Sequence, residues 1–184
     1  MPSDRKTYPI EIAGVFRQLP LFEVQPGLKI AVLNILGDTE LVKACAVALA
    51  EKLSEVNYSV LVTAEAKSIP VAHALSVVTG KPYAVLRKVY RAYMGETIQA
   101  ETISITTGKP QSLYLDEKDR ELLAGQRVVL LDDVISTGST LNGMREIVEK
   151  VAGTVAAEAA ILTEGEQSDW AQVLSLGHLP LFTD

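Results

Sequence analysis

The chain has 184 residues, with 23 Asp and Glu against 17 Lys and Arg, a net charge of −6 and a pI of about 5.0. This acidic balance argues against a surface that coats nucleic acid, and no apolar run approaches the roughly 20 residues that span a bilayer. The first residues lack the apolar core of a signal peptide, and the one cysteine, Cys45, excludes a disulfide framework or a Cys-rich metal site. We therefore expect a single cytoplasmic domain over 1–184, with neither a nucleic-acid nor a membrane partner.

Short apolar segments alternate with amphipathic segments along the chain. In chain order, the pattern predicts a strand over 29–34, a helix over 38–53, a strand over 58–63, a helix over 69–80, a strand over 82–87, an irregular segment over 89–101, a hairpin formed by "TISIT" and "SLYL", a short helix over 116–126, a strand over 128–132, a helix over about 140–151 and a strand over 155–162. This alternation implies an α/β fold, in which a parallel sheet has helices on both faces. Ligands of such sheets bind outside the carboxyl ends of the strands.

The segment "VVLLDDVISTGST", residues 128–140, ends a predicted strand with two adjacent acids. Asp132 and Asp133 repel each other and lose hydration there, so a ligand is expected to offset that cost. Five small residues then lead into a helix, whose first N–H groups are unpaired and suit an anion; they are Ser136, Thr137, Gly138, Ser139 and Thr140. Because carboxylates accept hydrogen bonds from a sugar diol, the segment predicts a site for a ribose 5-phosphate.

Other interpretations of this segment compete with that one. "TGST" is also an ordinary helix N-cap sequence, and paired aspartates also hold metal ions. An aspartyl phosphatase needs an acid at the position that Val134 occupies, and a receiver-type acidic pair comes near the N-terminus. The chain has neither G-x-x-x-x-G-K-[ST] nor a strand-linked G-x-G-x-x-G.

The same segment resembles the ribose-5-phosphate motif of the type I phosphoribosyltransferases, and the resemblance extends over about 29–162. It is nearest to the adenine and xanthine branch. The resemblance implies a core over 29–162 between an N-terminal arm or hood, 1–28, and a C-terminal cap, 163–184. It also implies transfer of ribose 5-phosphate from phosphoribosyl pyrophosphate (PRPP) to a purine base, in a homodimer, with Mg²⁺ held mainly by PRPP. Asp132 and Asp133 would be the catalytic acids on the 2′- and 3′-hydroxyls, and 136–140 would bind the 5′-phosphate.

The resemblance places a pyrophosphate site on two further strand ends. "TAEAKSIP", 63–70, is similar to the family's pyrophosphate loop, in which Glu65 and Ala66 match, Lys67 replaces arginine or serine and Ser68 replaces glycine. Arg87 and Lys88 end the next strand, where the family carries a basic residue that contacts pyrophosphate. The missing glycine raises the question of whether the backbone at 68 needs a conformation that only glycine adopts freely.

The resemblance indicates where a base would bind, without naming the base. The candidates for base contact are Asn34, Ile35, Leu36 and Glu164, with Phe16 and Arg17 in the N-terminal hood. Residues 89–107 correspond to the family's mobile loop. Thr106 stands where adenine enzymes carry a glutamate for proton transfer, which tilts the expectation towards an oxopurine such as xanthine or hypoxanthine.

A PRPP-binding regulator without turnover is the alternative to an enzyme. The replaced loop glycine and the absent glutamate favour it. The first 28 residues form an arm that is not basic, which argues against a DNA-binding extension. An orotate-type transferase is a further alternative, but its lysine-rich loop is not visible in 89–101.

Overall fold

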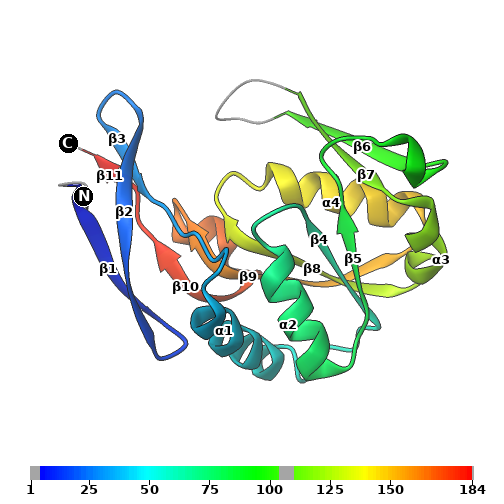
Figure 1. The fold of residues 1–184 in the computed structure, drawn as a ribbon, viewed down its shortest axis with the longest axis horizontal. Coiled ribbons are helices and arrows are strands. Elements are labelled where there is room, and N and C mark those ends of the chain that lie inside the picture. The colour runs from blue at the N-terminus through cyan, green and yellow to red at the C-terminus, as the bar shows by residue number, and fades with distance from the viewer. Residues whose placement is uncertain (1–4, 104–109, 184) are drawn as a thin grey trace.

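The computed structural model describes residues 5–103 and 110–183 and shows a helix-covered parallel sheet beside a smaller antiparallel sheet (Figure 1). The strands are β1 Thr7–Ile12, β2 Val15–Gln25, β3 Leu28–Ala31, β4 Val60–Ala64, β5 Tyr83–Leu86, β6 Ile98–Ile103, β7 Pro110–Leu115, β8 Arg127–Ile135, β9 Thr154–Glu164, β10 Leu174–Leu179 and β11 Phe182–Thr183. The helices are α1 Thr39–Lys52, α2 Ile69–Thr79, α3 Arg120–Leu123 and α4 Ser139–Lys150, with 3₁₀ turns η1 Ala92–Met94, η2 Glu117–Asp119 and η3 Gln167–Trp170.

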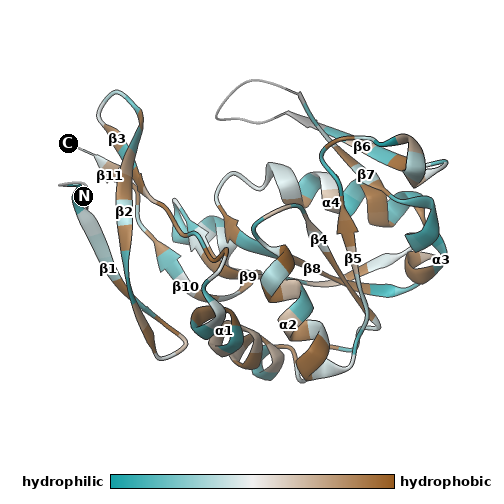
Figure 2. Cartoon of the chain, in the orientation of Figure 1, coloured by the Kyte–Doolittle hydropathy of each residue, from teal (hydrophilic) through white to brown (hydrophobic). Residues whose placement is uncertain are grey.

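The central sheet has the strand order β10-β9-β8-β4-β5, and every pair in it is parallel. Successive side chains of a strand point to opposite faces. In β8, Val129 and Leu131 therefore belong to the core under α1 and α2, while Val128 and Leu130 belong to the core under α4. Figure 2 shows the apolar residues concentrated on β4, β5 and β8. The predicted α/β fold with helices on both faces is confirmed.

The second sheet has the order β1-β2-β3-β11, with antiparallel pairing throughout, and we call it the hood sheet. Both ends of the described chain lie at this sheet (Figure 1). The segment predicted as the first strand of the parallel sheet, 29–34, was placed wrongly, because β3 ends at Ala31 and pairs with β2 and β11. Conversely β10, which was not predicted, extends the parallel sheet beyond β9.

A hairpin of β6 and β7 projects beside β5, and its predicted existence is confirmed. Its first strand begins at Ile98, so the prediction that 89–101 is irregular was wrong for the last residues of that segment. Arg87, just after β5, exchanges two backbone hydrogen bonds with Tyr114 of β7, at 2.9 and 2.8 Å, which fixes the hairpin to the sheet. Thr106 lies outside the described residues.

The predicted helix boundaries hold where a cap defines them. Asp38 caps α1 by accepting from the Leu41 N–H at 3.2 Å, and Gly80 ends α2 in the left-handed conformation, with φ +68°. The predicted helix over 116–126 divides into η2 and α3. None of the helices in 5–103 and 110–183 is long and apolar enough to cross a bilayer.

Candidate functional site

Two adjoining pockets lie at the carboxyl ends of β4 and β8. The first, of about 100 Å³, is lined by Asp132 and by the loop from Val134 to Leu141. The second, of about 320 Å³, is lined by the loop after β4, by Lys88 and by the acidic pair of β8. Asp132, Val134 and Thr140 line both pockets, so a single ligand with two anionic ends can occupy them together.

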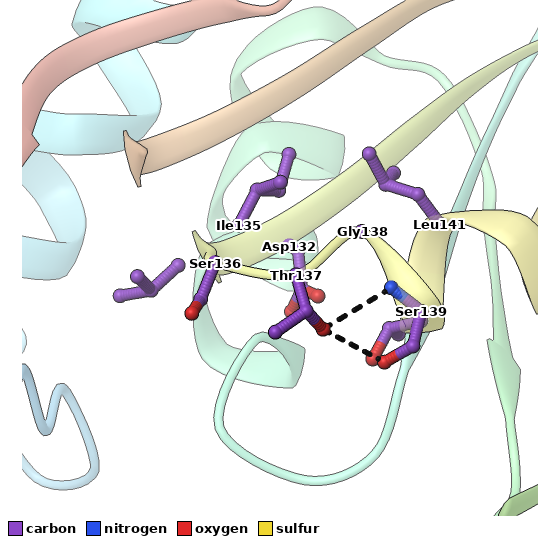
Figure 3. Close-up of a pocket in the computed structure, with 9 residues that line it drawn as sticks. Asp132, Ile135, Ser136, Thr137, Gly138, Ser139 and Leu141 are labelled. Atoms are coloured by element: carbon purple, nitrogen blue, oxygen red, sulfur yellow. Dashed lines mark hydrogen bonds between the residues drawn. The ribbon is translucent and has the colours of Figure 1, made fainter. Parts of the chain in front are cut away.

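The first pocket lies at the start of α4 and is formed by the segment that the sequence predicted to bind a phosphate. Gly138 is the N-cap and has φ +72° and ψ 0°, a left-handed conformation that favours glycine. The Thr137 and Ser139 side chains point toward one another, with their hydroxyl oxygens 3.1 Å apart, and the Ile135 and Leu141 side chains point away from them (Figure 3). The helix N-terminus therefore presents N–H groups and hydroxyls to the pocket, as binding a phosphate requires.

The acidic pair lies inside the last part of β8, whereas the sequence pattern placed the strand's end at 132. The strand continues to Ile135, because Asp132 and Val134 still pair with Ala160 and Leu162 of β9. The Asp133 N–H donates to Asp132 Oδ1 at 2.9 Å. Burial, and then the neighbouring charge of Asp133, raise the pKa of Asp132 well above its ordinary value of 3.8.

Lys67 joins the two sides of the second pocket. Its Nζ lies 2.9 Å from Asp133 Oδ2 and donates to the Leu33 carbonyl at 3.3 Å. Asp133 is only 7% exposed, whereas 45% of the Lys67 side chain is exposed. The ammonium group thus contacts Asp133 and, through the Leu33 carbonyl, the segment that carries the candidate base-binding residues.

The rest of the predicted pyrophosphate residues divide into two groups. Lys88 lines the pocket together with Ala66, whose peptide bond to Glu65 is cis. Glu65 also lines it, but its carboxylate accepts from Arg87 Nε and from the Lys88 N–H, both at 2.6 Å. Burial acts to raise the pKa of Glu65, yet these hydrogen bonds outweigh it and hold the pKa below its ordinary value. Glu65 and Arg87 therefore hold the loop against the end of β5, and their contact with pyrophosphate stays a prediction.

Ser68 answers the question that the missing glycine raised. Its φ of −79° and ψ of −11° are ordinary right-handed values, so no glycine is needed there. Its side chain is 1% exposed and donates to the Ala64 carbonyl at 2.7 Å, while Thr63 Oγ1 lies 2.7 Å from it. The side chain that serine has in place of the glycine hydrogen thus forms its hydrogen bonds inside the protein, with Ala64 and Thr63.

The candidate base-binding segment, 34–36, follows β3 beside Lys67. Asn34 and Leu36 have exposed side chains, and the Leu36 N–H donates to Asn34 Oδ1 at 3.2 Å. Ile35 is fully buried in the core under α1, and its predicted contact with a base stays a prediction. Arg17 of the hood binds Asp38 through two hydrogen bonds of 2.8 Å.

Glu164 and one residue that the sequence did not suggest contact the loop that forms the first pocket. Glu164 ends β9, is 4% exposed, and lies against the Ser136 hydroxyl. Burial raises the pKa of Glu164, an effect that Ser136 opposes. Trp170 of η3 lies behind Gly138. The only sequence signal for Trp170 was a lone tryptophan a few residues after a predicted strand.

Comparison with known proteins agrees with this geometry. Residues 32–169 match the family described as "Phosphoribosyl transferase domain". A hypoxanthine/guanine phosphoribosyltransferase of Methanospirillum hungatei is 30% identical over 131 residues, which are 71% of this chain and 68% of that protein. An adenine phosphoribosyltransferase of Thermosipho africanus is 27% identical over 83% of this chain and 87% of its own. The purine biosynthesis transcriptional activator PurR of Lactococcus lactis is 25% identical over 93% of this chain and 64% of its own.

Solved structures share the fold at lower sequence identity. An adenine phosphoribosyltransferase from Thermoanaerobacter pseudethanolicus superposes with a TM-score of 0.70 at 22% identity, over 87% of this chain and 95% of that one. The adenine phosphoribosyltransferase from Saccharomyces cerevisiae, complexed with an imino-altritol bisphosphate and adenine, superposes with a TM-score of 0.63 at 17% identity. The superposition covers 93% of this chain and 94% of that one. This chain spans about two thirds of the length of the first curated relatives that it matches, from 64% to 68%.

Proposed function

The chain belongs to the phosphoribosyl transferase domain family, and on that premise we propose that it transfers ribose 5-phosphate from PRPP to a purine base. In this reaction the bond between C1 of the ribose and pyrophosphate breaks, a bond from C1 to a ring nitrogen forms, and the proton of that nitrogen is released. One observation carries the proposal: the cradle at the start of α4 and the pocket that contains Lys67 and Lys88 share Asp132 and Thr140. The two pockets therefore match the two phosphorylated ends of PRPP on either side of a ribose.

The residues of the site have distinct roles in this proposal. The loop 136–140 binds the 5′-phosphate, and Asp132 and Asp133 accept hydrogen bonds from the ribose hydroxyls. Their negative charge also stabilises the positive charge that develops at C1. Lys67 and Lys88 take up charge on the leaving pyrophosphate, so binding replaces the Lys67–Asp133 ion pair by a contact of Lys67 with pyrophosphate and a contact of Asp133 with the ribose.

Mg²⁺ is the cofactor that the family resemblance implies. Among the described residues, no group of three or more His, Cys, Asp or Glu side chains lies close enough together to hold a metal ion by itself. This arrangement fits an ion that takes most of its ligands from the oxygens of PRPP, with Asp132 and Asp133 as the nearby carboxylates. When bound, Mg²⁺ would neutralise charge on the departing pyrophosphate.

The purine in this proposal rests on relatives that bear the names of hypoxanthine/guanine and adenine phosphoribosyltransferases. Asn34 and Leu36 are the side chains that we assign to the base, because Lys67 joins their segment to the acidic pair. We also propose a homodimer in the cytoplasm. The dimer rests on the family resemblance, and the compartment on the single buried cysteine, Cys45, which suits a reducing environment.

A substrate panel tests the proposal. Adenine, hypoxanthine, guanine, xanthine, orotate and uracil are each incubated with Mg²⁺ and PRPP, and pyrophosphate and nucleoside 5′-monophosphate are quantified. A site that hydrogen-bonds one ring edge rejects a wrong base by a factor of about 10⁴ to 10⁵, so one or two purines should react. Reaction with only orotate or uracil would contradict the assignment of a purine base as the substrate. Binding of PRPP without turnover of any base would favour a regulator, as the similarity to PurR over 93% of the chain allows.

A further inference from the structure

The loop of the proposed phosphate cradle, 136–140, contacts the segment at the end of β9. This segment runs from Glu164, the last residue of β9, to Trp170, the last residue of η3. Neither residue lines the pocket at the start of α4. Each nevertheless contacts one end of the turn formed by 136–138, and we call the pair the brace.

Trp170 is the half of the brace that contacts Gly138. A Cβ atom built on Gly138 would lie 3.1 Å from Cη2 and 3.4 Å from Cζ3 of the indole ring. The ring is half-buried and packs against the hydrophobic core between α4 and the sheet. Its Nε1 donates to the Glu164 carbonyl at 2.8 Å. The ring is therefore held from two sides, and it packs against Gly138 without lining the pocket.

Glu164 is the half of the brace that contacts Ser136. Its carboxyl group is buried and lies against the Ser136 hydroxyl, while its backbone carbonyl holds Trp170. One residue thus links the first residue of the turn to the ring that packs on the third. The left-handed Gly138, with φ +72°, thus contacts a residue outside the loop itself.

We propose that Trp170 is a positioning residue for the 5′-phosphate. The Trp170 ring holds the turn 136–138 in the conformation that presents the N–H groups of the turn to the anion. This inference rests on the proposed function, because it assigns the cradle to a ribose 5-phosphate. Its physical basis is preorganisation: donors that are already aimed at the phosphate need no ordering when the ligand binds. The ring acts through Gly138 and does not contact the ligand, so its loss should affect the phosphate end alone.

Trp170 is also the only tryptophan of the chain, which supplies a built-in reporter. Titration of the full chain with ribose 5-phosphate should change the tryptophan emission, and titration with Mg²⁺–pyrophosphate should leave it nearly unchanged. Saturation with ribose 5-phosphate, established by calorimetry, without any change in emission would overturn the inference.

Substitutions separate positioning from general stability. Trp170→Ala should weaken binding of ribose 5-phosphate about tenfold or more and leave binding of Mg²⁺–pyrophosphate within about twofold. Trp170→Phe, which keeps a ring over Gly138 but loses the N–H, should fall between this variant and the parent. Phe22→Ala, which truncates a 42% exposed aromatic side chain of the hood sheet, is the matched control and should leave both affinities unchanged.

The outcomes distinguish this inference from the proposed function. If Trp170→Ala folds and binds ribose 5-phosphate as the parent does, or weakens both ligands equally, the inference is overturned and the proposed function stands. If Trp170→Ala does not fold, Trp170→Phe decides by the same comparison of the two ligands. If the parent binds neither ribose 5-phosphate nor PRPP, the proposed function fails and the inference fails with it.

Discussion

Lys67 and Asp133 form an ion pair across the larger pocket, with Lys67 Nζ 2.9 Å from Asp133 Oδ2. The pair joins the loop after β4 to the end of β8. In the proposed reaction the ammonium group serves the pyrophosphate and the carboxylate serves the ribose. The group assigned to pyrophosphate and the group assigned to the ribose thus bind each other in the free protein, and in the proposed reaction both exchange partners when PRPP binds.

Replacing Lys67 by glutamine should weaken binding of Mg²⁺–PRPP. A hydrogen bond to a charged group contributes about 1.5–3 kcal/mol, which corresponds to about a 10- to 100-fold loss of affinity. Isothermal titration calorimetry measures the affinity for Mg²⁺–PRPP, and Lys52→Gln in the last turn of α1 is the charge-matched control. Equal affinities of the Lys67 variant and the control would show that the ammonium group does not contact the substrate.

Asp132→Asn should stabilise the free protein at neutral pH. The pKa of Asp132 in the folded protein is raised by burial and by Asp133, so its stabilising contribution is present below its ordinary value of 3.8 and is lost as pH rises through the folded pKa. Relative to the Asn variant, the parent should therefore lose stability as pH rises from about 5 to about 8, by on the order of 1 kcal/mol or more. Urea unfolding at both pH values measures this difference.

The control for that experiment is Glu51→Gln, which removes an exposed carboxylate of α1. Its stability difference from the parent should stay nearly constant over the same pH range. A constant difference for Asp132→Asn as well would mean that the acidic pair is not under electrostatic strain in the free protein.

Asp38 should contribute both a helix cap and an ion pair, and two substitutions separate them. Hydrogen bonds from Arg17 lower the pKa of Asp38, so its contribution is present above its ordinary value of 3.8 and is lost as pH falls through the folded pKa. Asp38→Asn keeps a good cap but loses the charge, so its deficit against the parent should shrink in acid. Asp38→Ala should cost about 1 kcal/mol more, because the Leu41 N–H loses its acceptor. Equal unfolding free energies of the two variants would contradict the capping role.

Gly138→Ala should destabilise the protein more than Gly80→Ala does. Both glycines have a left-handed φ, +72° and +68°, which costs a residue with a Cβ about 1–2 kcal/mol. A Cβ at Gly80 would meet nothing within 4 Å, whereas one at Gly138 would lie 3.1 Å from the Trp170 ring. The excess cost in thermal or urea unfolding therefore measures the contact with Trp170. Equal losses of unfolding free energy in the two variants would show that the Trp170 ring moves aside without a measurable cost.

The sequence predicted those parts of the fold and site that depend on nearby residues. The apolar run of β8, the acids that follow it and the helix after Gly138 lie within one short segment, so their relation could be read directly. The same holds for the Asp38 cap of α1.

Other features depend on partners that are distant in the chain. The pairing of β3 with β2 and β11 required knowledge of the C-terminus, and the binding of Arg87 by Glu65 joins the ends of two different strands. The contact of Trp170 with Gly138 depends on where the turn η3 packs after β9, and the periodicity of the sequence does not predict that position. Ile35 was assigned to a base because the segment 33–38 resembles a base-contacting segment of xanthine-type enzymes, and that resemblance does not show that the Ile35 side chain is buried.

Calorimetric titration of the chain with Mg²⁺–PRPP tests the central claim most directly, because both the enzyme and the regulator need this site. The parent should bind one PRPP per chain, and the variant with Asp132→Asn and Asp133→Asn together should fold but bind it at least about 100-fold more weakly, since the ribose hydroxyls lose two charged acceptors. A folded double variant that binds as tightly as the parent, or a folded parent that does not bind Mg²⁺–PRPP, would contradict the assignment.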